Sequence, residues 1–144
     1  MHLRLRTGHR TAGALVLAVA ATLAPCGAGA HGDWPARHGG VMNDGGETSF
    51  ELVREKRALV AHVSDHGVPL EVTGGTPELQ VRSAAGLQRV PGVARKTRIV
   101  FPPVRIGPGD ALALKLVQAD GSVAFGRFAP AAVARLAAGG VAPK

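Results

Sequence analysis

Turn-forming residues interrupt the sequence between residues 47 and 128 so often that long helices are excluded. Pairs such as Gly74-Gly75, Pro91-Gly92 and Pro102-Pro103 separate segments that begin about every 8–12 residues. Several of these segments alternate apolar and polar residues, so each can bury one face as a β-strand. We therefore predict an all-β fold.

The segments fit about seven short antiparallel strands, a number typical of a single immunoglobulin-like β-sandwich. A small barrel is the alternative. Asp120-Gly121 predicts a tight hairpin between the last two strands. The segments with strand character are 49–54, 58–64, 70–73, 78–83, 87–90, 96–101, 111–118 and 123–128.

The first thirty residues have the pattern of a secretory signal peptide. A basic stretch precedes an apolar run over 12–24, and Ala28-Gly29-Ala30 fits a signal-peptidase site. The run of about 13 residues is shorter than the roughly 20 that cross a bilayer as a permanent helix. We expect cleavage after Ala30, export to the periplasm and no stable membrane span in the mature chain.

Cys26, the only cysteine, lies in the segment that we expect to be removed, so the mature chain would hold no disulfide. Lipid attachment at Cys26 is the alternative. Pro25, however, stands where a lipoprotein signal has a small residue.

The composition argues against nucleic-acid binding and catalysis. The formal charge of +7 includes three arginines of the signal segment, and one Trp, four Phe and no Tyr give no row of stacking residues. The mature chain has no G-x-S-x-G, H-E-x-x-H or P-loop motif. Ser64, Asp65 and His66 are adjacent on a strand and would point to alternate faces. We therefore expect no enzyme and no nucleic-acid partner.

The sequence divides into four parts. We expect a signal peptide over 1–30, a flexible His- and Gly-rich N-terminal arm over 31–46, a β-sandwich domain over 47–128 and an Ala-rich C-terminal tail over 129–144. The arm has no hydrophobic period. The tail is too short to hold as an isolated helix without packing.

The histidines of the arm suggest a metal site. Cleavage after Ala30 would make His31 the N-terminal residue, so that its α-amine and imidazole Nδ1 could chelate one ion. His38 is seven residues further on and could add a nitrogen, and Asp33 an oxygen. Nitrogen-rich tetragonal sites favour Cu(II). The alternative is that both histidines are solvated and have no specific role.

Two further histidines lie in the predicted sandwich. Four residues of continuous strand separate His62 from His66 by about 13 Å, too far for a shared metal. We therefore expect His62 to be a partly buried strand residue. A turn at 65–67 would have to fold His66 back for it to act as a third ligand beside the arm.

Other candidate features are weaker. Met42 is the only methionine after the signal segment, so a Met-rich Cu(I) site is excluded. Arg95, Lys96 and Arg98 form a basic cluster, which we interpret as a solvated strand face. Contact with anionic lipid is the alternative interpretation of that cluster.

Four short motifs resemble a known family. They are His38-Gly39-Gly40-Val41, Phe50-Glu51-Leu52-Val53, Asp65-His66-Gly67-Val68-Pro69 and Gly126-Arg127-Phe128. They are similar to those of small exported bacterial proteins and of an N-terminal domain in the periplasmic adaptor subunits of heavy-metal efflux pumps, of the copper/silver and cobalt/zinc/cadmium type. The resemblance covers about residues 38–128.

The resemblance implies a periplasmic β-sandwich module associated with metal handling, with no catalytic residue. His38 and His66 match positions of the pattern that have ligand chemistry, whereas His31 and His62 lie outside it. Residues 70–76 depart from the pattern. The helical hairpin and lipoyl-like regions of an adaptor are absent from the sequence, so this chain is not a pump adaptor by itself.

We therefore expect a monomeric periplasmic accessory protein that binds a transition metal, copper first, and is linked to heavy-metal efflux or resistance. The expected ligands of Cu(II) are His31, His38 and His66, and a periplasmic efflux component is the expected protein partner. The alternative is a non-catalytic periplasmic protein–protein interaction module without a metal of its own.

Overall fold

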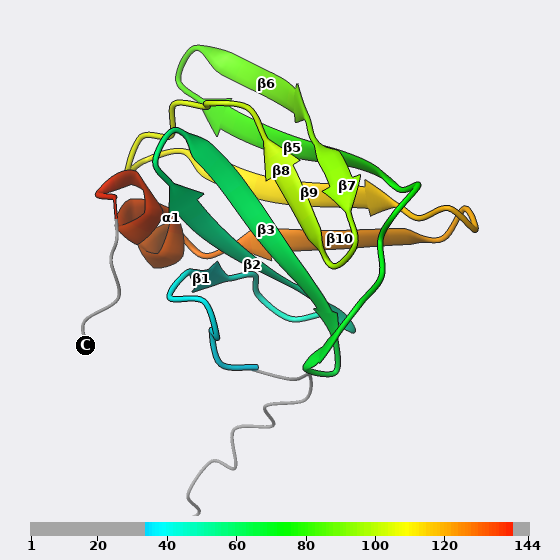
Figure 1. Ribbon diagram of the computed structural model, residues 1–144. Coiled ribbons are helices and arrows are strands. Elements are labelled where there is room, and N and C mark those ends of the chain that lie inside the picture. Colours follow the sequence, from blue (N-terminus) through cyan, green and yellow to red (C-terminus); the bar gives the residue numbers. More distant parts are fainter. Residues whose placement is uncertain (1–33, 140–144) are drawn as a thin grey trace, which may run out of the picture.

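The computed structural model describes residues 34–139, which form two antiparallel β-sheets and one short helix (Figure 1). The apolar inner faces of the two sheets share one core. The prediction of a β fold built from two antiparallel sheets is confirmed in the coarse sense that the fold is mostly β, with one helix in addition. Residues 34–139 form ten strands where about seven were expected, because β1, β4 and β7 are pairings of only two or three residues.

The larger sheet, sheet A, has six strands in the order β1-β2-β3-β8-β7, with β4 paired to β3 beside that path. Sheet B has four strands in the order β10-β9-β5-β6. The strands of sheet A are β1 Val41–Met42, β2 Thr48–Glu55, β3 Ala58–Asp65, β4 Val68–Pro69, β7 Val93–Arg95 and β8 Arg98–Phe101. Those of sheet B are β5 Thr76–Ser83, β6 Gly86–Pro91, β9 Ala111–Val117 and β10 Val123–Phe128.

The core follows from the alternation of the long strands. Leu112, Leu114 and Leu116 of β9 are buried, and the residues between them are partly exposed. On β3 the side chains of Leu59, Ala61 and Val63 face the core, as the period of two predicts. His62 faces away from the core, on the outer face of sheet A.

The structure differs from the expected strands at three places. Residues 70–73 form no strand; Leu70 N–H donates to Val63 O, and the strand next to them is the two-residue β4. Lys96 has a φ of 52° in the turn between β7 and β8, so β8 begins at Arg98. The third difference is that the short strands β1, β4 and β7 lie outside the expected segments. They have too few residues to show an alternating pattern.

The Ala-rich tail contains helix α1, Pro130–Ala137, which packs beside β1 and β2 (Figure 1). Ala132, Val133 and Leu136 are buried, so packing holds this eight-residue helix. Among residues 34–139, no helix has the length and apolar character needed to cross a membrane.

Gly92 is tightly packed against β8 where the chain passes from β6 to β7. A Cβ atom at this position would lie 2.6 Å from Phe101 Cε1 and 2.8 Å from Ile99 Cγ2. Gly92→Ala should therefore lower the free energy of unfolding by about 1–3 kcal/mol in urea titrations. Gly109→Ala is the matched control, because nothing lies within 4 Å of a Cβ there. Equal midpoints for the two variants would contradict this packing.

Candidate functional site

A row of polar side chains crosses the outer face of sheet A. Met42 of β1 is opposite Glu51 of β2, Glu51 is opposite His62 of β3, and His62 is opposite Arg98 of β8. Directly opposed residues of antiparallel strands share a face of the sheet. The strand register therefore brings a thioether, a carboxylate, an imidazole and a guanidinium side by side.

The segment from Trp34 to Gly40 lies over this row and covers Glu51, which is only 4% exposed. The backbone N–H groups of Arg37, His38 and Gly40 donate to the Glu51 carboxylate at 2.7–2.9 Å. The His38 ring Nδ1 lies 2.9 Å from Glu51 Oε2. In the described part of the predicted arm, residues 34–46, these four hydrogen bonds and strand β1 connect the chain to sheet A.

Gly40 permits this close approach of the arm to the strand. A Cβ atom at Gly40 would lie 2.3 Å from the carbonyl oxygen of Leu52, closer than any side chain allows. The backbone at Gly40 can therefore reach Glu51 only because the residue has no side chain.

Glu51 is charged at neutral pH. Burial by itself would raise the pKa of its carboxyl, but hydrogen bonds from the backbone of Arg37, Gly40 and His38 and from the His38 ring together hold the pKa below its ordinary value of 4.5. An ionised carboxylate only accepts hydrogen bonds, so His38 Nδ1 must carry the donated proton. In the neutral ring the lone pair is then on Nε2.

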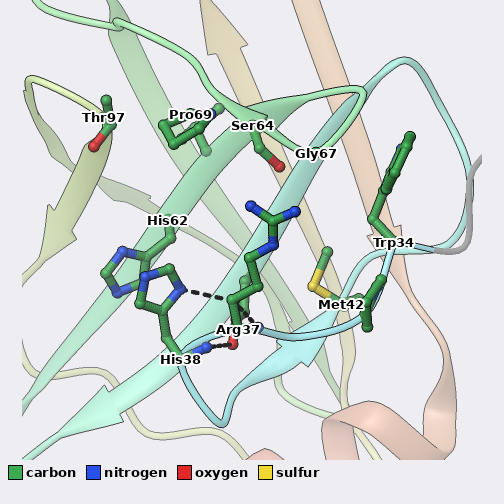
Figure 2. Close-up of a pocket in the computed structure, with 12 residues that line it drawn as sticks. Trp34, Arg37, His38, Met42, His62, Ser64, Gly67, Pro69 and Thr97 are labelled. Carbon is green, nitrogen blue, oxygen red and sulfur yellow. Dashed lines mark hydrogen bonds and ion pairs between the residues drawn. The ribbon is translucent and has the colours of Figure 1, made fainter.

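The rings of His38 and His62 are stacked (Figure 2). Their centroids are 3.6 Å apart and their planes differ by 3°. Burial lowers the pKa of His62, and the neighbouring His38 lowers it further, while Glu51 and Glu55 partly oppose the shift. His62 is therefore neutral at pH 7. Because imidazole lone pairs lie in the ring planes, the two parallel rings cannot bind one ion until one ring turns.

A pocket of about 90 Å³ lies beside the stacked rings, and Trp34, Arg37 and Met42 also line it (Figure 2). The Trp34 indole packs on Gly67, where a Cβ atom would come within 2.9 Å of Trp34 Cε3. This contact joins the N-terminal segment to the turn between β3 and β4, which carries His66.

The structure describes two of the three predicted ligands, His38 and His66. His31 and Asp33 lie outside the described residues. His38 lies with Glu51 and His62, whereas His66 is on the exposed turn, with Nδ1 2.6 Å from Asp65 Oδ1. No group of three or more His, Cys, Asp or Glu side chains within residues 34–139 could hold a metal ion. A complete metal site would need a donor from elsewhere in the chain.

Sequence reasoning did not identify Glu51 as part of the candidate site. Its signal in the sequence is a single carboxylate between Phe50 and Leu52, both fully buried in the structure. Acidic residues are rarely buried unless they are paired. The covering segment, which makes Glu51 a buried anchor, has no pattern that indicates this contact.

A comparison of the chain with protein families, curated proteins and solved structures finds no match. The geometry of the site and the sequence motifs are therefore the basis for a functional proposal.

The stabilisation by Glu51 is expected to be lost in acid. In the folded protein the pKa of Glu51 lies below its ordinary value of 4.5. The contribution of Glu51 to the free energy of unfolding is therefore complete above the ordinary pKa and is lost as the pH falls through the lowered one. Urea titrations of the wild type and Glu51→Gln should give free energies of unfolding that differ at neutral pH and converge as the pH falls through the lowered pKa of Glu51. A difference that does not change with pH would contradict this assignment.

Proposed function

We propose that this protein is an exported periplasmic accessory protein that binds copper as Cu(II) and serves heavy-metal efflux or resistance. The observation that carries the proposal is the environment of His38. Its Nδ1–H is donated to the buried Glu51 carboxylate, so Nε2 is left as the ligand atom. Metal-binding histidines generally donate their other ring N–H to a carboxylate or carbonyl in this way. Glu51 is thus a positioning residue for His38.

His31 is the main ligand of the proposed site, through its α-amine and imidazole. It lies outside the described residues and enters the proposal from the sequence. Two residues lie between it and Trp34, so three residue steps join them, a chain length of at most about 11 Å. Since Trp34 packs on Gly67, the residue after His66, a ligand at His31 is in range of the turn that carries His66. His38 is the second ligand and His66 the third.

The donor chemistry supports copper. The proposed set consists of one amine nitrogen and imidazole nitrogens, and Cu(II) has the highest affinity among the divalent first-row metals for nitrogen donors. His62 stacks on His38, and burial lowers the pKa of His62, so this ring adds no positive charge next to the bound cation. The resemblance of the sequence motifs to heavy-metal efflux adaptors points to the same class of cargo.

The experiment is mass spectrometry of the exported protein followed by a Cu(II) titration of the same sample. We expect a mature chain that begins at His31 and takes up one Cu(II) per molecule. The amine must lose its proton to bind, so the affinity should fall as the pH drops below about 7.7–8.0. A chain that begins elsewhere, or no uptake at micromolar Cu(II), would overturn the proposal.

We also infer that the two sheets have the immunoglobulin-like arrangement. The order β2-β3-β8-β7 corresponds to strands A, B, E and D of that fold, and β10-β9-β5-β6 corresponds to G, F, C and C′. In this correspondence β1 and β4 are short additions to sheet A. The strand order supports an immunoglobulin-like sandwich over the small barrel that the sequence left open.

A further inference from the structure

Three hollows follow one another along the outer face of sheet A. The first, of about 550 Å³, lies between the β2–β3 turn and the end of β8, and Arg57, Arg95 and Arg98 line it. The second, of about 490 Å³, shares Arg95 and Arg98 with the first. It also shares His62 and Thr97 with the pocket beside His38. Together they form one groove that leads to the stacked histidines.

The groove is positively charged. Arg57, Arg95, Lys96 and Arg98 are all exposed. Within residues 34–139, none of their side chains makes an ion pair or a hydrogen bond with another side chain. The charge of Lys96 contributes to lowering the pKa of Glu71, a carboxylate that accepts hydrogen bonds from Thr73 and forms no ion pair with Lys96. The cations of the groove are therefore free to pair with a ligand.

Two of these cations face each other directly. Arg95 of β7 is opposite Arg98 of β8 in the strand register. Like charges at directly opposed positions of a sheet are destabilising. Such a pair carries a cost in the free protein that an acidic ligand lying between the two strands would remove.

The floor and edge of the groove fit an extended chain. Val93, 54% exposed, lines the first hollow together with Val100, Pro102 and Pro103. The strand that carries Val93, β7, is the last strand of sheet A on that side. An extended segment can lie along such an edge and place alternate side chains in the groove. The backbone of an edge strand can pair with a peptide, whereas a lipid surface has no strand to add.

We propose that this groove binds an extended acidic segment of a partner protein, in which acidic and apolar residues alternate. The acidic side chains pair with Arg57, Arg95, Lys96 and Arg98, and the apolar side chains contact Val93 and the two prolines. The docked segment ends next to His38 and His62. Docking itself is independent of the metal, and its use in copper transfer rests on the proposed function.

The test is fluorescence anisotropy with a labelled peptide of about twelve residues that alternates Asp and Val. The mature protein is kept in EDTA, so the result does not depend on copper binding. We expect saturable binding that weakens with added salt. A peptide that alternates Lys and Val should not bind.

The variant Arg95→Glu/Arg98→Glu should weaken binding of the Asp-Val peptide by about tenfold or more. Arg82→Glu/Arg127→Glu changes the net charge equally on the outer face of sheet B and should leave the affinity within about twofold. Urea midpoints establish that both variants are folded.

Three results would overturn the proposal: no binding of the Asp-Val peptide, an equal loss in the two variants, or binding to phosphatidylglycerol vesicles without binding to the peptide. Failure of the Cu(II) titration with intact peptide binding would reject the proposed function and leave the docking groove standing.

Discussion

Replacing Glu51 with glutamine is expected to lower the free energy of unfolding at neutral pH by about 3 kcal/mol. The carboxylate is 4% exposed and accepts three backbone hydrogen bonds and one from the His38 ring. The amide has only one acceptor oxygen, and its NH₂ group would face backbone donors. A loss of this size is a large part of the free energy of unfolding of a typical domain, which is roughly 5–15 kcal/mol. Urea titration measures it.

Glu55→Gln is the matched control on the same strand. Its carboxylate is exposed, so the substitution should change the free energy of unfolding by less than about 0.5 kcal/mol. Amide hydrogen exchange at His38 and Gly40 should accelerate in Glu51→Gln only. Unchanged exchange at these amides would contradict the role of Glu51 as the anchor of the N-terminal segment.

Replacing His38 with alanine is expected to weaken Cu(II) binding by about a hundredfold, because one of three proposed ligands is removed. Glu51→Gln leaves the imidazole in place but removes its carboxylate partner, so it should weaken binding by about tenfold. Competition titrations with a chelator of known affinity give both values. The two variants thus separate a ligand from the residue that orients it.

Glu78→Gln on sheet B is the control for these titrations. Its carboxylate pairs with Arg89 and lies on the other sheet, so Cu(II) affinity should stay at the wild-type value. Wild-type affinity in His38→Ala would mean that His38 is not a ligand. A loss in Glu51→Gln as large as that in His38→Ala would mean that the site collapses with the anchor.

The long strands could be predicted from the sequence because their pattern is local. Residues 111–118 and 123–128 alternate strictly, and β9 and β10 occupy them with small differences at the ends. Strands β1 and β7, with two and three residues, have too little sequence to alternate. They form because neighbouring strands offer edges for pairing, which is a property of the tertiary structure.

The candidate site was predictable only in part. His38 stood out by its residue type and its place in the arm. Its partners did not, because Glu51 lies 13 residues away and the backbone groups that bury it have no side-chain signature. The stacking of His38 on His62 depends on strand register and on the path of residues 34–40, neither of which the spacing of the histidines reveals.

The most direct test of the copper proposal is an electron paramagnetic resonance titration of the mature protein with Cu(II), beside the variant His31→Ala. The substitution keeps the α-amine but removes the imidazole that closes the chelate ring. We expect a mononuclear Cu(II) signal with nitrogen coupling in the wild type, and affinity lower by about tenfold or more in His31→Ala. An identical spectrum and affinity in the two proteins would contradict the N-terminal site.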